Sequence, residues 1–290
     1  MNAKAIYEEM KTRFEGVAEV TLEEVHKSFG TRTGIRIREN GEKTVSTLYL
    51  EDFMRYGYSV KSVCDRMVQA YKSNREGLDK VSELEWVNDF DNVREKILPR
   101  LVNPKICGEY LKDKPHRDFS DLALIYWFST DDFGGAMGVI TVSDDLAEMW
   151  GVTEEELYEI AGQNITPELV DIVDVELENM GEISEEMKIM FEYSRGQLYV
   201  LTNKKWSDMA YFGAGVLPYM MTKLQERFSK FIVIPSSIHE LIIAPTEADC
   251  FQPDQEELTG LVKEVNQTSV EERDRLSDHS YFWNGSEFVI

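Results

Sequence analysis

The segment Leu122-Ala-Leu-Ile-Tyr-Trp-Phe128 places seven apolar residues in succession, and a second apolar run extends from Met137 to Val142. Continuous apolar runs of this length are typical of strands that are buried on both faces. The intervening segment Asp131-Asp132-Phe-Gly-Gly135 contains the acidic and glycine residues that turns favour. We therefore expect the two runs to be strands of a central sheet, with a turn between them.

Two helices are expected directly after this sheet. Asp144 and Asp145 fit a helix N-cap and a first-turn acid. Thr153-Glu-Glu-Glu156 is a capping box, and the helix that it opens continues through Leu157 and Ile160. The last third of the chain then alternates strands and helices. Its expected elements are strands at 197–202, 231–235 and 239–245, helices at 215–228 and 254–266, and a final hairpin at 280–290 that turns on Asn284-Gly285.

The first hundred residues contain a helix at the N-terminus and a clear hairpin. Gly34 to Arg38 and Val45 to Leu50 read as strands, and Asn40-Gly41 supplies the positive φ angles that a tight turn needs. Before the hairpin, residues 17–29 favour a strand, with a short capped helix as the alternative. After it, apolar residues spaced by three and four predict one helix over 59–73 and a second from Phe90 to Leu101.

These elements predict an α/β protein, with an α+β arrangement as the alternative, in which helices pack on a mixed sheet. An N-terminal helix and hairpin precede the sheet, and a strand-helix-strand-strand-helix-hairpin unit ends the chain. We place the division between residues 1–104 and residues 105–290, with an acidic helical segment at 144–193 inside the second part. The alternative is a single domain, since 290 residues fit one large domain or two modest ones.

Composition excludes several classes of function. The chain has 54 acidic and 31 basic residues and a net charge of 23 negative, so it repels nucleic acid and anionic lipid, and we expect neither as a direct partner. No signal peptide and no apolar run of membrane-spanning length is present. Three widely separated cysteines fit reduced core thiols, and we expect a cytoplasmic protein.

Acidic charge is concentrated in one window of fifty residues. Residues 144–193 contain sixteen acidic residues and one basic residue, Lys188. The plain interpretation is a solvated helical face that keeps the protein soluble, and the functional one is a docking surface for a basic protein. The expected contact residues are Asp144, Asp145, Glu148, Glu154, Glu155, Glu156, Glu159, Glu176 and Glu178.

An enzyme is the competing hypothesis. The polar run Pro235-Ser-Ser-Ile-His-Glu240 lies between two apolar strands, where α/β proteins often carry functional groups. A hydrolase or metal-dependent enzyme would need its side chains in one cleft, within about 4 Å of a common centre. The candidates are His239, Glu240, His116, Asp278 and His279. Their spacing matches no metal motif, and the glycines match no nucleotide-binding loop, so no cofactor and no metal is expected.

Six segments of the chain form an ordered set of motifs. They are Leu48-Tyr-Leu-Glu-Asp52, Pro115-His-Arg-Asp-Phe-Ser-Asp-Leu-Ala123, Met149-Trp-Gly-Val-Thr-Glu-Glu-Glu-Leu-Tyr158, Leu198-Tyr-Val-Leu-Thr-Asn203, Ile234-Pro-Ser-Ser-Ile-His-Glu-Leu241 and Leu276-Ser-Asp-His279. In this order they resemble DUF5688, an uncharacterised family of gut Firmicutes proteins. The second half is more distantly similar to the YtpQ-like DUF1444 proteins. The resemblance implies a protein carried by conjugative and other mobile elements, and it implies no activity.

The charge pattern and the resemblance together predict a non-enzymatic accessory protein of a mobile element. Its acidic surface would meet a basic protein. One concrete version is imitation of DNA, because an acidic helical pair can present charges spaced like phosphates and so inhibit a host nucleic-acid enzyme.

Overall fold

A computed structural model describes residues 2–41, 45–54, 57–78, 81–133, 136–166, 170–175, 194, 197–203, 213–235, 237–246 and 254–290. The expected α/β class is confirmed, in its α+β form. The paired strands of these residues are all antiparallel, and they form three separate sheets rather than one mixed sheet. Within the described ranges, no helix is long and apolar enough to cross a bilayer.

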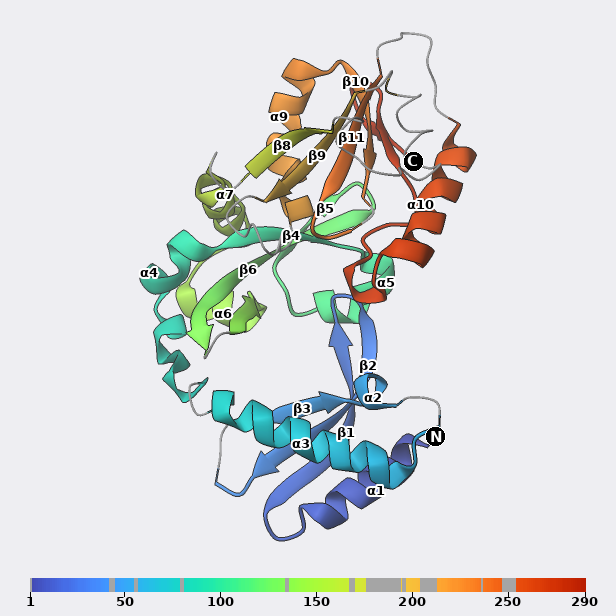
Figure 1. The fold of residues 1–290 in the computed structure, drawn as a ribbon. Coiled ribbons are helices and arrows are strands. Elements are labelled where there is room, and N and C mark those ends of the chain that lie inside the picture. Colours follow the sequence, from blue (N-terminus) through green and yellow to red (C-terminus); the bar gives the residue numbers. More distant parts are fainter. Residues whose placement is uncertain are drawn as a thin grey trace.

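The N-terminal unit is a three-stranded sheet with two helices on one face (Figure 1). The N-terminal helix, the strand after it and the antiparallel pairing of β2 with β3 are confirmed. Gly41 has the expected positive φ of 90° and Asn40 does not, and the connection between the two strands runs over residues 40–45, of which 42–44 lie outside the described residues. Ile6 and Met10 of the first helix are fully buried against Ile35 and Ile37 of the sheet. The elements are α1 (Ala3–Arg13), β1 (Ala18–Lys27), β2 (Gly30–Glu39), β3 (Ser46–Tyr49), α2 (Leu50–Phe53) and α3 (Val60–Leu78).

A second hairpin, formed by β1 and β2, connects this unit to the rest of the molecule. Its turn, Ser28-Phe29, was not expected from the sequence, since it lacks the usual Gly or Asn at its centre. The Nη2 atom of the buried Arg100 donates a hydrogen bond to Oγ of Ser28 at 2.8 Å. Burial lowers the pKa of Arg100 to about 10.

The middle sheet contains the apolar run that begins at Leu122, and both runs are confirmed as strands. The helix expected from Phe90 to Leu101 is wrong. Helical turns extend only to Lys96, and Leu98–Val102 is a strand that pairs with β6, because Pro99 cannot continue a helix and residues 99–102 are buried in the middle sheet. The elements are η1 (Val81–Asn88), α4 (Phe90–Val93), η2 (Arg94–Lys96), β4 (Leu98–Val102), α5 (Pro104–Leu111), β5 (His116–Phe119), β6 (Leu122–Phe133), β7 (Ala136–Thr141), α6 (Asp144–Trp150) and α7 (Glu154–Asn164).

The C-terminal sheet has six strands in the order β13-β12-β10-β11-β9-β8, with α9 and α10 beside it (Figure 1). The expected strands and helices of the last third are confirmed, and Asn284-Gly285 turns the last hairpin. One strand corrects the expectation of a helical segment over 144–193, because β8 lies inside it and pairs with β9. The elements are β8 (Val170–Val175), β9 (Leu198–Asn203), η4 (Gly213–Val216), α9 (Leu217–Arg227), β10 (Lys230–Ile234), β11 (Leu241–Thr246), α10 (Gln255–Ser269), η5 (Glu272–Asp274), β12 (Tyr281–Trp283) and β13 (Phe288–Val289).

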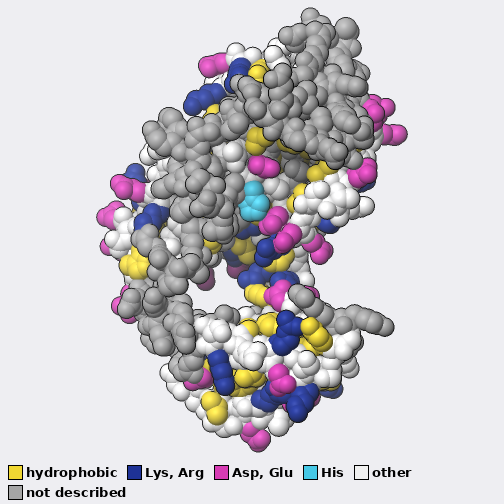
Figure 2. All heavy atoms as spheres, in the orientation of Figure 1, with side chains coloured by type: hydrophobic (Ala, Val, Ile, Leu, Met, Phe, Trp, Pro, Cys, Tyr) yellow, Lys and Arg dark blue, Asp and Glu magenta, His cyan; other side chains and the backbone are white. Residues whose placement is uncertain are grey.

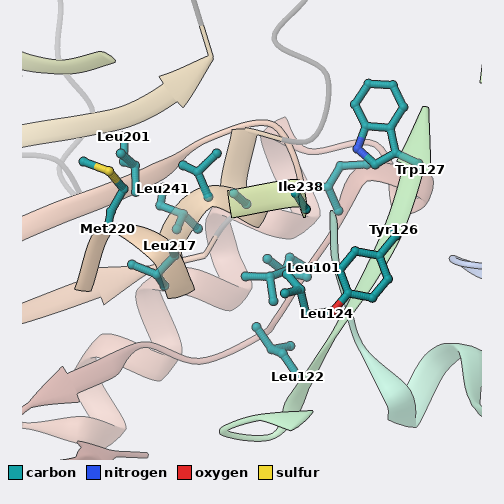
Figure 3. Close-up of a cluster of buried hydrophobic side chains, with 14 of the residues drawn as sticks. Leu101, Leu122, Leu124, Tyr126, Trp127, Leu201, Leu217, Met220, Ile238 and Leu241 are labelled. Atoms are coloured by element: carbon teal, nitrogen blue, oxygen red, sulfur yellow. The ribbon is translucent and has the colours of Figure 1, made fainter. Parts of the chain in front are cut away.

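One hydrophobic cluster joins the middle and C-terminal sheets. Figure 3 shows Leu101, Leu122 and Leu124 of the middle sheet in the same cluster as Leu201 and Leu241 of the C-terminal sheet. The N-terminal unit has a cluster of its own, which ends at Tyr71, whereas the joint cluster begins at Val87. The domain division expected at residue 104 stays a prediction. The change from one hydrophobic cluster to the other falls earlier, between Tyr71 and Val87, and β4 already belongs to the same sheet as β6.

Candidate functional site

The acidic residues expected to bind a partner lie largely on α6 and α7. Ser143 caps α6, since its Oγ atom accepts a hydrogen bond from the backbone N–H of Leu146 at 3.3 Å. Asp144 was expected to be the cap but lies with Asp145 in the first turn, where the helix dipole favours a carboxylate. We call the exposed carboxylates of these two helices the acidic surface. They belong to Asp144, Asp145, Glu148, Glu155, Glu156 and Glu159.

The capping box of α7 is confirmed. The backbone N–H of Thr153 donates to Oε2 of Glu156 at 2.8 Å, and the backbone N–H of Glu156 donates to Oγ1 of Thr153 at 3.3 Å. The bond from the Thr153 backbone, together with one from its hydroxyl, lowers the pKa of Glu156. Glu156 therefore has a structural task at the start of the helix, although its side chain is exposed.

Arg117 of β5 binds two acids at the start of α7. Its guanidinium donates to both carboxylate oxygens of Glu154, at 3.2 and 2.9 Å, and to Oε2 of Glu155 at 2.5 Å. The hydroxyl of Tyr126 donates to the same Glu154 carboxylate. Hydrogen bonding to Glu154 raises the pKa of Arg117. Glu154 is therefore a half-buried link between α7 and the middle sheet rather than a free contact residue.

Two tyrosines complete the surroundings of Arg117. The guanidinium carbon lies 3.9 Å from the ring centroid of Tyr158, and that ring stacks on Tyr219 with centroids 4.6 Å apart. The Tyr219 ring fits beside α7 because residue 162 is glycine, where a Cβ atom would lie 2.9 Å from Cε1 of Tyr219. The arginine is thus held by carboxylates and an aromatic face, which are the two partners that a guanidinium prefers.

The acidic surface also contains an exposed apolar side chain. Met149 of α6 is 58% exposed. It lies one helical turn after Asp145, and both side chains therefore share one face of the helix, with Glu148 adjacent in sequence. A flexible thioether surrounded by carboxylates is a surface that adapts to apolar residues of a basic partner. The two remaining contact candidates, Glu176 and Glu178, lie outside the described residues.

The three histidines proposed for catalysis contact different groups. Nδ1 of the exposed His116 lies 2.8 Å from the carbonyl oxygen of Lys114. Nε2 of His239 lies 3.4 Å from Oδ1 of Asp274. Nε2 of His279 lies 3.1 Å from Oδ2 of Asp121.

The other two catalytic candidates are also engaged elsewhere or exposed. Oδ1 of Asp278 accepts a hydrogen bond from the amide of the buried Asn266 at 2.8 Å. Glu240 is exposed, and its backbone N–H and that of His239 point at Oγ of Ser237, at 3.4 and 3.1 Å. Across the described ranges, no group of three or more His, Cys, Asp or Glu side chains is arranged to hold a metal ion.

Asp121, which sequence reasoning did not select, is the centre of a polar cluster. Its Oδ1 atom accepts a hydrogen bond from the Tyr281 hydroxyl at 2.6 Å, and Lys105 reaches its Oδ2 atom at 3.1 Å. Burial alone would raise the pKa of Asp121, but the bonds from Tyr281, His279 and Lys105 outweigh it and lower that pKa. Asp121 and His279 are 158 positions apart, so no local pattern could have paired them.

The geometry of His279 favours a structural role, as a hydrogen-bonded link between two parts of the chain, rather than a role as a general base. Its Nε2 atom faces Asp121, and its Nδ1 atom lies 3.1 Å from the carbonyl oxygen of Ser280. Both neighbours are hydrogen-bond acceptors, so each ring nitrogen already faces a protein group. A general base needs a nitrogen that is free to receive the substrate's proton, and here both nitrogens are engaged.

A small cavity lies on the face of the N-terminal sheet that the helices leave uncovered. Its volume is about 120 Å³. Arg36 crosses it to Glu23 at 2.6 Å, so these two charges are paired across the hairpin. Figure 2 shows Lys and Arg side chains gathered over the N-terminal unit at the lower end of the molecule. The cavity is lined by Glu19, Thr21, Glu23, Arg36, Arg38 and Val45.

Comparison with known proteins gives a family without an activity. The sequence matches no curated protein and no solved structure. A family model, described as a family of unknown function (DUF5688), matches residues 3–285. Because this match covers nearly the whole chain, the chain belongs to the DUF5688 family.

Proposed function

We propose that this protein is a non-enzymatic accessory protein that binds a basic protein partner through the acidic surface of α6 and α7. The resemblance to proteins of mobile elements and the charge pattern support a place in the cytoplasm beside such a partner. The observation that carries the proposal is the exposure of Met149 among the carboxylates of Asp145 and Glu148. Met149 offers a partner an adaptable apolar contact beside charges that attract a basic surface.

The contacts of Arg117 reduce the set of residues that a partner can use. Glu154 is tied to Arg117 and Tyr126, Glu155 also binds Arg117, and Glu156 caps its own helix. The carboxylates without such tasks belong to Asp144, Asp145, Glu148 and Glu159. These four exposed groups, with Met149, are the proposed contact residues.

A finer version of the proposal is imitation of nucleic acid. Exposed carboxylates on two successive helices attract the Lys and Arg side chains that would otherwise contact phosphates. A host nucleic-acid enzyme would then lose its binding to DNA when this protein is bound. Adding the protein to a captured partner should displace a labelled DNA duplex, and simultaneous binding of both would contradict mimicry while leaving docking intact.

The test of docking is a charge reversal that spares the structural acids. The triple variant Asp145→Lys, Glu148→Lys and Glu159→Lys changes the net charge by six units. The matched control makes the same change at exposed acids elsewhere, with Glu8→Lys, Glu264→Lys and Glu272→Lys. Both variants and the native protein would be used for affinity capture from native-host lysate at low and at high salt.

We expect the native protein and the control to capture the same basic protein at low salt, and the surface variant to lose it. Capture should weaken as salt rises, because screening shortens the reach of these charges. Equal loss of capture by both triple variants would show that net charge alone acts, and equal retention would show that these acids do not bind the partner. Either result would contradict a specific surface.

The enzyme hypothesis has a separate test. His239→Ala removes a histidine that the docking hypothesis does not use, and the folded variant should capture the partner as the native protein does. The variant would also be compared with the native protein for the effect that its expression has on the native host. If that effect disappears while partner capture and the thermal unfolding temperature are unchanged, the hypothesis of catalysis around His239 and Glu240 gains support.

A further inference from the structure

Strand β7 lies in an uncharged segment of an acidic chain. The sequence from Gly134 to Ser143 contains no charged residue, although 29% of the whole chain is charged. Among the described residues, β7 pairs with β6 and with no other strand, so it lies at an edge of the middle sheet. Natural sheets normally protect such an edge with charge or proline, because an open edge invites pairing with another chain.

The register shows which backbone groups of β7 point outward. The N–H of Val142 donates to the carbonyl of Tyr126 directly opposite, which makes this a hydrogen-bonded pair. Pairs alternate in an antiparallel ladder, so Ile140 and Gly138 also bond to β6. Val139 and Thr141 therefore turn their N–H and C=O groups away from β6.

The surroundings of this edge agree with a bound strand. The side chain of Val139 is 39% exposed, which leaves an apolar residue open at the centre of the edge. At the end of β7, the exposed carboxylates of Asp144 and Asp145 follow after only two residues. The edge is thus uncharged along its length and acidic at one end, and it continues directly into the acidic surface.

We propose that β7 binds an extended segment of the basic partner, which adds to the middle sheet as a further strand. This inference rests on the proposed function and names the form in which the partner binds. The segment pairs its backbone with the outward groups of Val139 and Thr141, and its alternate apolar side chains lie beside Val139. Lys or Arg at one end of the segment faces Asp144 and Asp145.

A defined peptide tests the proposal. The probe is Lys-Lys-Val-Thr-Val-Thr-Val-Lys-Lys, blocked at both ends and labelled with a fluorophore, and its affinity for the full chain is measured by anisotropy. Its matched control is the same peptide with N-methyl groups on the five central residues, which keeps the charge and removes the backbone donors. We expect the methylated peptide to bind at least about tenfold more weakly.

Two protein variants distinguish the contribution of the backbone N–H at position 139 from that of the side chain. Val139→Pro removes an outward N–H without removing a bond to β6, whereas Val139→Thr keeps that N–H. The proline variant should lose about tenfold in affinity, and the threonine variant should stay within about threefold of the native protein. Hydrogen exchange in the native protein should slow over residues 136–142 when the peptide is bound, which tests the strand without any substitution.

The results distinguish strand addition from charge attraction. If the methylated and unmethylated peptides bind equally and salt abolishes both, the acidic surface binds basic chains but strand addition is overturned. If neither peptide binds, strand addition is likewise overturned, and the triple charge-reversal variant still tests docking by itself. Slowed exchange confined to α6 and α7 would also overturn the role of β7.

Discussion

Asp121 and His279 lie 3.1 Å apart, between Oδ2 of the carboxylate and Nε2 of the imidazole, although 158 positions separate them in the chain. Asp121 lies at the turn between β5 and β6, and His279 just precedes β12. Their side chains are 20% and 18% exposed, so the pair is largely removed from water. The bridge fastens the middle sheet to the C-terminal sheet, beside the hydrophobic cluster that the two sheets share.

Substitution of Asp121 by Asn should destabilise the protein by roughly 2 kcal/mol at pH 7, because hydrogen bonds to a charged group are stronger than those to a neutral one. Urea unfolding followed by circular dichroism measures this change. Lys105→Ala is the control. Its side chain is 74% exposed, and we expect a loss below about 1 kcal/mol. An equal effect of both substitutions would contradict a central role for the carboxylate.

The contribution of Asp121 to stability should depend on pH with a defined sign. Its pKa in the folded protein lies below that in the unfolded chain, which is about 3.9. The native carboxylate therefore stabilises the fold above that value and loses its effect as pH falls through the folded pKa. The difference in unfolding free energy between the native protein and Asp121→Asn should shrink between about pH 5 and pH 2. A difference that stays constant would show that the charge is not responsible.

Replacing Arg117 by Ala should loosen the start of α7, because the half-buried Glu154 would lose its guanidinium partner and keep only the hydrogen bond from Tyr126. We expect a loss of about 1 to 3 kcal/mol in unfolding free energy. Glu155→Gln is the matched control, since this exposed carboxylate makes only the outer contact with Arg117, and it should cost less than about 1 kcal/mol. If Glu155→Gln lowers the unfolding free energy as much as Arg117→Ala does, the main contact of Arg117 is the exposed one with Glu155 and not the half-buried one with Glu154.

Gly215→Ala should be strongly destabilising. A Cβ atom there would lie 2.5 Å from the carbonyl oxygen of Pro99, and neither backbone can yield without separating η4 from β4. We expect a loss of about 1 to 3 kcal/mol or more. Gly260→Ala is the opposite case, because it lies in α10 with open space around the added methyl group, and it should stabilise by up to about 1 kcal/mol. Thermal unfolding tests both predictions: the unfolding temperature should fall for Gly215→Ala and rise for Gly260→Ala.

Two of the three thiols should react only when the protein unfolds. Cys64 and Cys107 are buried, and burial raises the pKa of both, that of Cys107 to about 11. The thiolate is the reactive form, so alkylation at pH 8 should be slow at both positions in the native protein and fast in urea. Peptide mapping by mass spectrometry identifies the labelled cysteines, and rapid native labelling of Cys107 would contradict its burial.

Structural features that depend on a few neighbouring residues could be determined from the sequence alone. The capping box of Thr153 and Glu156 and the turn at Asn284-Gly285 need only contacts between residues two to four positions apart. The same holds for amphipathic helices such as α3, whose apolar spacing already defines a buried face. Fold class follows from the order of such elements.

Tertiary structure alone decided the features that depend on distant partners. Leu98–Val102 continues the apolar spacing of a helix, but pairing with β6 makes it a strand. Ser143, and not the expected Asp144, is the N-cap of α6. Glu154, which was expected to contact a partner, binds Arg117 instead. The bridge from Asp121 to His279 and the outward backbone of Val139 arise in the same way. Local pattern selects an element, but burial, strand register and ion pairing depend on which surface the rest of the chain brings against it.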